Sequence, residues 1–128
     1  MRNEMMHRPV VKEELVDFMR TKQKKLEGEL GLIEEEAHLA EVPIIPHETV
    51  VFMQFLLGQL QPKKILEIGA AIGFSSSLMA QTIEKDGHVT TIDRFDVMIK
   101  KAKATYERLN LTDKVTLLEG QAADILPT

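Results

Sequence analysis

Apolar residues recur at helical spacing in the first third of the chain, where two stripes precede residue 40. The first stripe consists of Val11, Leu15 and Phe18, and the second consists of Leu26, Leu30, Ile33 and Ala37. A spacing of three or four residues predicts amphipathic helices, each with one face against other elements. The segment ETVVFMQFLLGQL (48–60) is apolar on nearly every side, which predicts a helix buried between other helices.

From residue 64 onward, short apolar runs alternate with longer helical segments. The predicted strands are KILEI (64–68), HVTTID (88–93) and VTLLEG (115–120). The first of them is apolar on both faces, which is typical of a parallel strand covered by helices on both sides. A helix is predicted at 74–84, and the face of the next helix consists of Phe95, Met98, Ile99, Ala102, Tyr106 and Leu109. Strands separated by helices indicate βαβ units and a parallel sheet.

These patterns predict a single α/β domain in two parts. Residues 1–61 form an N-terminal helical segment that packs on the sheet, and residues 62–128 form the first βαβαβ half of a doubly wound domain. In such folds the first strand lies at the centre, and later strands pair with its other edge. We therefore expect a domain truncated after its third strand, with a bare apolar edge at 64–68. The missing part would be on the order of 80–100 residues.

Composition narrows the class of protein. With 16 Lys+Arg and 20 Asp+Glu, the chain has a formal net charge of −4 and is not strongly basic. The absence of cysteine excludes a disulfide scaffold and thiol catalysis. No apolar run approaches the roughly 20 residues that span a bilayer, and the N-terminus lacks the apolar core of a secretory signal. We expect a soluble, cytoplasmic protein.

The most informative segment is EIGAAIGFS (67–75), where the first predicted strand passes into a helix. Open α/β sheets bind ligands at this kind of junction. Gly69 allows a sharp turn off the strand, and Gly73 allows the helix to approach both the strand and a ligand. Asp93 ends the second strand 20 residues after Gly73. That is the spacing at which a carboxylate accepts both hydroxyls of a ribose.

Two classes of cofactor compete for this junction. A dinucleotide needs the loop G-x-G-x-x-G to hold its pyrophosphate, but Ala71 stands where the middle glycine would be. Glu67 would repel phosphate and attract a cation. S-adenosylmethionine (SAM) carries a sulfonium and an ammonium group and no phosphate, so the loop favours SAM over the cofactor of a nicotinamide-dependent dehydrogenase. The simplest alternative is that both glycines only permit tight packing and that Glu67 is solvated.

The segments 42–80, 89–94 and 115–127 resemble, in order, motifs of bacterial O-methyltransferases of the catechol and caffeoyl-CoA type. The resemblance extends from about residue 9, and it is strongest to the subgroup that methylates 5-hydroxyuridine at the wobble position of tRNA. It implies a Rossmann-like SAM methyltransferase fold, SAM as the methyl donor, a divalent metal that is usually Mg²⁺, and a homodimer.

The resemblance also implies roles for particular residues. Glu67, Gly69 and Gly73 match the donor-binding loop, and Asp93 matches the acid that binds the ribose. The turn 120–122 would border the adenine, and the segment 44–48 would close over the donor. The predicted donor-binding set is Ile44, Glu48, Glu67, Gly69, Ala70, Gly73, Ser75, Asp93, Arg94, Gly120, Gln121 and Ala122.

The family's metal ligands, an Asp after the fourth strand and an Asp-Asn pair after the fifth, have no counterpart in residues 1–128. We therefore assign no catalytic or metal-binding residue and expect little or no turnover from this chain alone. The favoured function is metal-assisted methyl transfer from SAM to 5-hydroxyuridine in tRNA. Transfer to a small catechol-like or acyl-CoA hydroxyl is one alternative, and a non-catalytic binding or assembly module is another.

Two smaller features of the N-terminal part bear on partners. The cations Arg20, Lys22, Lys24 and Lys25 could contact RNA phosphates. In a chain of net charge −4, such a cluster is more often a solvated helix face. His47 lies beside the segment expected to cover the donor and is a candidate for a ligand contact.

Overall fold

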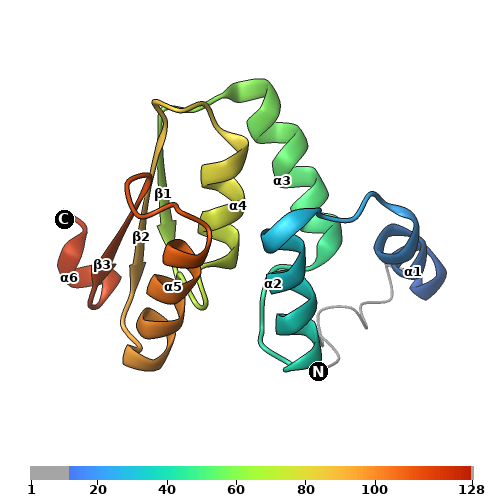
Figure 1. Cartoon of the computed structure of the whole chain (residues 1–128), viewed down its shortest axis with the longest axis horizontal. Helices are drawn as coiled ribbons and strands as arrows, with labels where there is room; N and C mark the ends of the chain where they lie inside the picture. Colours follow the sequence, from blue (N-terminus) through green and yellow to red (C-terminus); the bar gives the residue numbers. More distant parts are fainter. Residues whose placement is uncertain (1–11, 128) are drawn as a thin grey trace.

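Three helices precede the first strand in the computed structural model, which describes residues 12–127 (Figure 1). The elements, in order, are α1 (Glu13–Lys22), α2 (Gly28–Leu39), α3 (His47–Leu60), β1 (Lys64–Ile68), α4 (Phe74–Thr82), β2 (His88–Asp93), α5 (Asp96–Arg108), β3 (Val115–Glu119) and α6 (Ala122–Ile125). The predicted α/β fold and its alternation of strands and helices are confirmed. Within these residues, no helix is long and apolar enough to cross a membrane.

The three strands form one parallel sheet in the order β1-β2-β3. Val89 pairs with Ile65 on one side and with Val115 on the other, so three β-branched side chains form a row. Two residues further along, Glu67 pairs with Thr91. Because parallel strands end at the same edge, the loop after β1, the end of β2 and the turn after β3 meet there.

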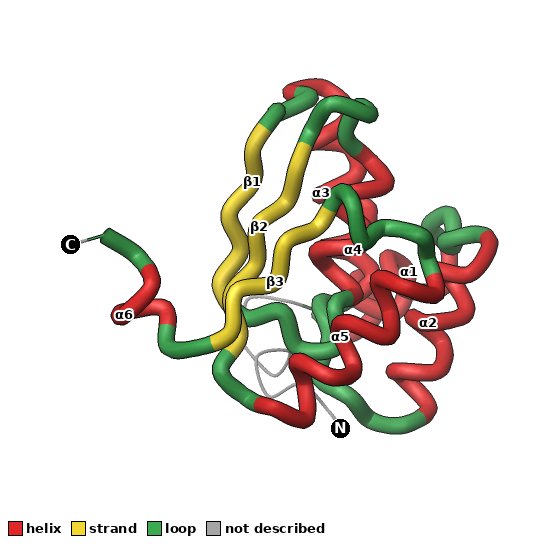
Figure 2. Tube along the Cα trace, turned by 60° about the vertical axis from the view of Figure 1, so that its left-hand side comes forward, coloured by secondary structure: helices red, strands yellow, loops and turns green. Residues whose placement is uncertain are grey.

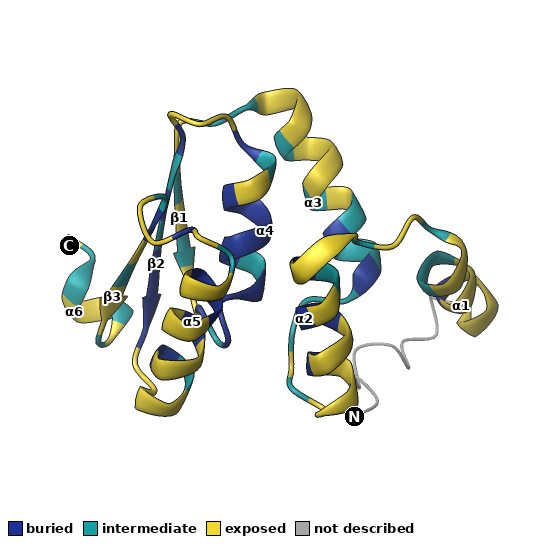
Figure 3. Ribbon diagram, viewed as in Figure 1, coloured by how far each residue is buried: buried dark blue, intermediate teal, exposed yellow. Residues whose placement is uncertain are grey.

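Helix α4 lies at the centre of the fold and has buried residues on both sides (Figure 3). Toward the sheet, Met79 and Ala80 of α4 and Ile83 directly after it form a core with Val89 and Val115. A second core lies between α4 and the helices α2 and α3; its members are Leu30, Ile33, Ala37, Val50, Ile72, Phe74 and Leu78. The predicted stripe is therefore confirmed for Leu30, Ile33 and Ala37, whereas Leu26 precedes α2 and packs against the same core while partly buried.

Helices α4 and α5 cover one face of the sheet (Figure 2). On the opposite face, Leu66 and Ile68 are 56% and 62% exposed. The prediction that β1 is covered from both sides is therefore wrong for the described part of the chain. Ile65 and Glu67 are better buried than their neighbours because they point toward the helices.

The prediction that the helix at 48–60 is enclosed by other helices is also wrong. In α3, His47 and Val50 are buried, whereas Phe52 and Phe55 are 60% and 64% exposed. The helix packs on α4 and on α1, and much of the rest of its surface is exposed (Figure 3). An all-round apolar surface therefore does not show how many neighbours a helix has.

Two predicted apolar stripes differ from the structure at their ends. In α1, Leu15 and Phe18 are exposed and Val16 is the buried residue, while Val11 lies outside the described residues. Phe95 precedes α5 with extended backbone, so its exposed side chain does not share the buried face of the helix. A short apolar stripe in the sequence predicts that a segment is helical, but it does not predict which side of the helix packs against a neighbouring element.

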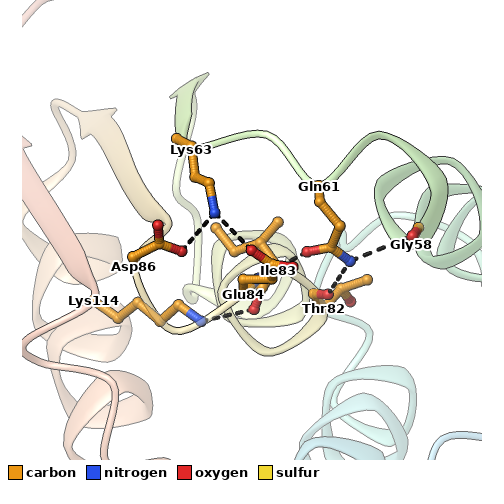
Figure 4. Close-up of polar contacts among 8 residues, drawn as sticks. All are labelled: Gly58, Gln61, Lys63, Thr82, Ile83, Glu84, Asp86 and Lys114. Carbon is orange, nitrogen blue, oxygen red and sulfur yellow. Dashed lines mark hydrogen bonds and ion pairs between the residues drawn. The ribbon is translucent and has the colours of Figure 1, made fainter.

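Polar contacts fasten the amino-terminal ends of β1 and β2 to the ends of α3 and α4 (Figure 4). Lys63 Nζ lies 2.6 Å from the Glu84 carboxylate and 2.7 Å from that of Asp86. The side-chain carbonyl of Gln61 accepts a hydrogen bond from the backbone N–H of Glu84 at 2.8 Å. This cluster lies at the edge of the sheet opposite the carboxyl ends of the strands.

Candidate functional site

Backbone hydrogen bonds join the carboxyl ends of the three strands. The N–H of Gly69, just after β1, donates to the carbonyl of Ile92 at 2.8 Å, and the N–H of Gly120, just after β3, donates to the carbonyl of Asp93 at 2.8 Å. Gly69 has a φ of +92°, which side-chain-bearing residues rarely adopt. Apart from its immediate neighbours, no described atom lies within 4 Å of the position that a Cβ would take there. The loop therefore turns sharply off β1 and leaves open space at the turn.

Hydroxyl groups hold the carboxylate of Glu67. Ser75 Oγ on α4 donates to one oxygen at 2.6 Å, and Thr91 Oγ1 on β2 donates to the other at 2.6 Å. Burial raises the pKa of Glu67, and the nearby charge of Asp93 adds to this, although the hydroxyl donors oppose it. A carboxylate in this setting favours a cationic neighbour. The alternative that Glu67 is merely solvated does not hold.

Asp93, at the end of β2, binds the glycine-rich loop directly. One carboxylate oxygen accepts a hydrogen bond from the backbone N–H of Ala71 at 2.9 Å, and the other accepts one from the N–H of Phe95 at 3.0 Å. Each oxygen of an ionised carboxylate can accept a second hydrogen bond. Asp93 therefore keeps acceptor capacity for two ribose hydroxyls, and that contact stays a prediction.

Gly73 begins α4 with a φ of +79° and is approached closely by α5. A Cβ on Gly73 would lie 2.8 Å from the ring of Tyr106 and 3.1 Å from the Cα of Ala102. The close approach predicted at this glycine thus involves α5. Ala70 is buried in the core, and its carbonyl accepts the Gly73 N–H at 2.8 Å, so its side chain is not placed to touch a ligand.

Arg94 and Gln121 connect the ends of β2 and β3. The guanidinium of Arg94 donates to Gln121 Oε1 at 3.1 Å and lies over the ring of Phe95, 4.7 Å from its centroid. Gln121 directly precedes α6, which begins at Ala122. The predicted residues after β2 and β3 are therefore brought together at the edge that carries the glycine-rich loop.

The segment predicted to cover the donor divides into two parts. Ile44 packs against the buried cluster that includes Ile72 of the glycine-rich loop. Glu48 accepts two hydrogen bonds from Arg20 of α1, at 2.9 and 3.0 Å. Burial alone would raise the pKa of Glu48, but the hydrogen bonds and charge of Arg20, together with a backbone hydrogen bond, outweigh burial, so the pKa lies below its ordinary value. The structure thus places Ile44 near the loop and ties Glu48 to α1.

His47 connects α3 to α2 and to the segment before α2. Its Nδ1 lies 2.8 Å from Glu34 Oε1, and its Nε2 lies 3.0 Å from the carbonyl of Lys24. A carbonyl can only accept, so Nε2 carries a proton. Both ring nitrogens are engaged and the residue is buried, so His47 has a packing role and the ligand contact considered for it is not supported.

Thr91, Ser76 and Tyr106 belong to this site but are absent from the predicted set. Thr91 is paired with Glu67 across the sheet, so the strand register would have indicated it. Ser76 Oγ lies 2.7 Å from the Tyr106 hydroxyl, and burial raises the pKa of Tyr106 to about 12. No local pattern links two residues that are 30 positions apart.

A metal ion finds no site in the described part of the chain. Residues 12–127 contain no group of three or more His, Asp or Glu side chains that could hold one. The side chains present therefore do not fit the Mg²⁺ that the resemblance implies, and we derive no chemical step through it.

Comparison with known proteins identifies the family. The profile of the family described as O-methyltransferase matches residues 21–128. A catechol O-methyltransferase from Niastella koreensis is 33% identical over 92 residues, covering 72% of this chain and 41% of the relative.

Solved structures agree in fold. A Staphylococcus aureus protein, provisionally assigned as a caffeoyl-CoA O-methyltransferase, is 34% identical with a TM-score of 0.71 over 85% of this chain and 50% of that one. The O-methyltransferase TomG from Streptomyces achromogenes, solved in complex with SAM, is 25% identical with a TM-score of 0.74 over 88% and 52%. The chain thus spans about half the length of these relatives. With its fold, its glycine-rich junction and the match over residues 21–128, the chain belongs to the O-methyltransferase family.

Proposed function

We propose that this chain forms the SAM-binding part of a SAM-dependent O-methyltransferase. The observation that carries the proposal is the hydrogen bond from the Ala71 N–H to Asp93. It joins the end of β2 to the glycine-rich loop, so the ribose-binding acid and the donor-binding loop form one unit. Membership of the O-methyltransferase family supports the same assignment.

The charges at the junction favour SAM over a dinucleotide. Glu67 and Asp93 are close enough for the charge of Asp93 to raise the pKa of Glu67. Such a pair would repel a pyrophosphate and attract the sulfonium and ammonium groups of SAM. The open space at Gly69 leaves room for a ligand against the loop. When bound, SAM supplies an electrophilic methyl group, and the residues of this chain hold and orient the adenosine.

For the acceptor we propose 5-hydroxyuridine in tRNA, on the resemblance of the segments 42–80, 89–94 and 115–127. A small catechol-like hydroxyl is the second candidate, and it is favoured by the match to the Niastella koreensis catechol O-methyltransferase. A cytoplasmic location is a further part of the proposal and rests on the composition. Metal assistance by Mg²⁺ rests on the resemblance alone, because the described residues contain no group that could hold the ion.

A homodimer completes the proposal. The exposed residues Phe52, Phe55 and Leu56 follow the spacing i, i+3, i+4 and form one apolar face of α3. Contiguous exposed apolar surface of this kind marks interaction sites. We place the contact between two copies on this face of α3.

Calorimetric titration of S-adenosylhomocysteine (SAH), the demethylated product of SAM, into the chain tests the donor site. We expect binding, with NADH binding more weakly or not at all. Tighter binding of NADH, or indifference to SAH in a tightly associated oligomer, would favour the dehydrogenase or the assembly module. A protein extended to the length of its relatives is then assayed with labelled SAM on tRNA lacking the modification and on catechol. Transfer to catechol alone would reverse the order of acceptors.

A further inference from the structure

Tyr106 contacts the glycine-rich loop from α5, at a distance of 33 positions along the sequence from Gly73. Its side chain is buried, and the edge of its ring occupies the space in which a side chain at position 73 would lie. The Cα of Ala102, one turn earlier on α5, lies on the same side of Gly73. The end of the loop therefore packs against α5.

The hydroxyl of Tyr106 begins a chain of hydrogen bonds that ends on the loop backbone. Ser76 Oγ donates to the carbonyl of Gly73 at 3.3 Å, and the same Oγ lies 2.7 Å from the Tyr106 hydroxyl. A serine hydroxyl has one hydrogen, so when Ser76 donates to Gly73 the hydroxyl of Tyr106 must be the donor to Ser76. Burial raises the pKa of Tyr106 to about 12, which keeps this donor protonated near neutral pH.

The first turn of α4 is therefore fixed from two directions. Ser75 is bonded to Glu67 of β1, and the next residue, Ser76, is bonded to Tyr106 of α5. The bond between Ser76 and Tyr106 is buried and that between Ser75 and Glu67 is partly buried, and hydrogen-bonded networks of this kind favour one conformation of the backbone that they hold. Between them, the two serines define where Gly73 and the start of α4 lie relative to the strand ends.

We propose that Tyr106 is a positioning residue for the methyl donor, acting through Ser76 and Gly73 and not by touching the donor itself. The inference rests on the proposed function, because it requires that the loop bind SAM. It extends the site to a residue on α5 that the glycine motif does not contain.

The composition of the chain supplies a direct readout. Tyr106 is the only tyrosine, and there is no tryptophan, so the ultraviolet emission of the protein reports the surroundings of this side chain. A donor that seats on the loop should change the polar surroundings of the Tyr106 hydroxyl through Gly73 and Ser76. We expect saturating SAH to change the emission of the wild-type chain.

The experiment compares SAH affinity, measured by calorimetry, in Tyr106→Phe, Ser76→Ala and the double variant, with Tm recorded for each. We expect each single variant to weaken SAH binding about 5–10-fold. The double variant should bind SAH with about the same affinity as the weaker-binding of the two single variants, because both changes break the same connection. Ile83→Val is the matched control: it removes one buried methylene at the far end of α4, so Tm should fall while SAH affinity stays at the wild-type value.

Three results would overturn the proposal. Unchanged SAH affinity in Tyr106→Phe and Ser76→Ala, with a lower Tm, would show that the contact only stabilises the fold. Unchanged emission at saturating SAH would show that Tyr106 is not coupled to the loop. A folded wild-type chain that binds no SAH would contradict the proposed function as well as the positioning role, so failure of the function is distinguished from failure of the inference.

Discussion

The carboxylate of Asp93 accepts the backbone N–H of Ala71 at 2.9 Å, and Ala71 has a φ of +46°. A left-handed conformation costs a residue with a side chain about 1–2 kcal/mol. The bond to Asp93 helps to hold Ala71 in this conformation and so determines the path of the loop. One acid therefore shapes the loop and, in the proposed function, binds the donor.

Variants of Asp93 and Ala71 together separate the effect of Asp93 on the loop from its effect on donor binding. Asp93→Ala should weaken SAH binding by about 1.5–3 kcal/mol, the range for hydrogen bonds to charged groups. Ala71→Gly keeps the N–H and removes the strain, so SAH affinity should stay close to that of the wild type. Calorimetry on both variants and on the double variant gives the ribose contribution. Unchanged affinity in Asp93→Ala would contradict the assignment of Asp93 to the ribose.

The raised pKa of Glu67 predicts that SAM binding depends on pH. A cation favours the ionised carboxylate, so affinity for SAM should increase as pH rises from the ordinary carboxyl value of 4.5 through the raised pKa of Glu67. Titrations of SAM across this range, with the wild type and Glu67→Gln, provide the measurement. The glutamine variant should lose most of the dependence; an identical profile in both proteins would exclude Glu67 as its source.

The raised pKa of Glu67 affects folding stability in the opposite direction: stability should decrease as pH rises. Burial favours the protonated form of Glu67 in the folded chain, so its contribution is greatest below the ordinary carboxyl pKa and is lost as pH rises through the raised pKa. The Tm difference between Glu67→Gln and the wild type should therefore shift in favour of the variant as pH rises. A shift in favour of the wild type would show that the hydroxyl donors outweigh burial.

The two glycines of the loop should respond differently to alanine. Gly69→Ala meets open space and suffers only the strain of its positive φ, so we expect a loss of about 1–2 kcal/mol in the free energy of unfolding. Gly73→Ala adds a clash with Tyr106 that costs a further 1–3 kcal/mol or so. Denaturant unfolding of the two variants measures the difference, and equal losses would show that α5 gives way to the added methyl group.

Exposed apolar residues predict self-association at an identifiable surface. Phe55→Glu changes the outer side of α3, and Leu66→Lys changes the bare face of the sheet; both side chains are more than half exposed, so each variant should remain folded. Light scattering should show that Phe55→Glu shifts a dimer to monomer, while Leu66→Lys does not. The reverse result would place the contact on the sheet.

The strands and the junction could be predicted from the sequence because their signals are local. KILEI and HVTTID are short segments with apolar, mostly β-branched residues that are followed by clear turn residues, and the structure has both strands at the predicted bounds. Burial of whole faces could not be predicted in the same way. Whether Leu66 or Phe52 is covered depends on which elements pack there, and an apolar side chain fits a covered or a bare surface equally well in sequence terms.

The glycine motif of the candidate site could be predicted from the sequence, but the tertiary contacts that hold it in place could not. The glycine spacing and Asp93 are visible in one segment and one strand end. The bond between Ser76 and Tyr106 and the pair between Glu48 and Arg20 depend on tertiary packing, which periodicity does not encode. The sequence thus indicates where a ligand lies more readily than what keeps its binding loop in shape.

The contacts of Lys63 with Glu84 and Asp86 lie at the edge of the sheet away from the strand ends that carry the site. Lys85, between the two acids, is exposed, and the chain contains no cysteine. Lys85→Cys would therefore introduce the sole thiol of the protein at the end of the sheet remote from the glycine-rich loop. A dye or a surface linker attached at this turn would leave the edge of the sheet that carries the candidate site exposed to solution. The turn is therefore a suitable attachment point for immobilised or single-molecule measurements.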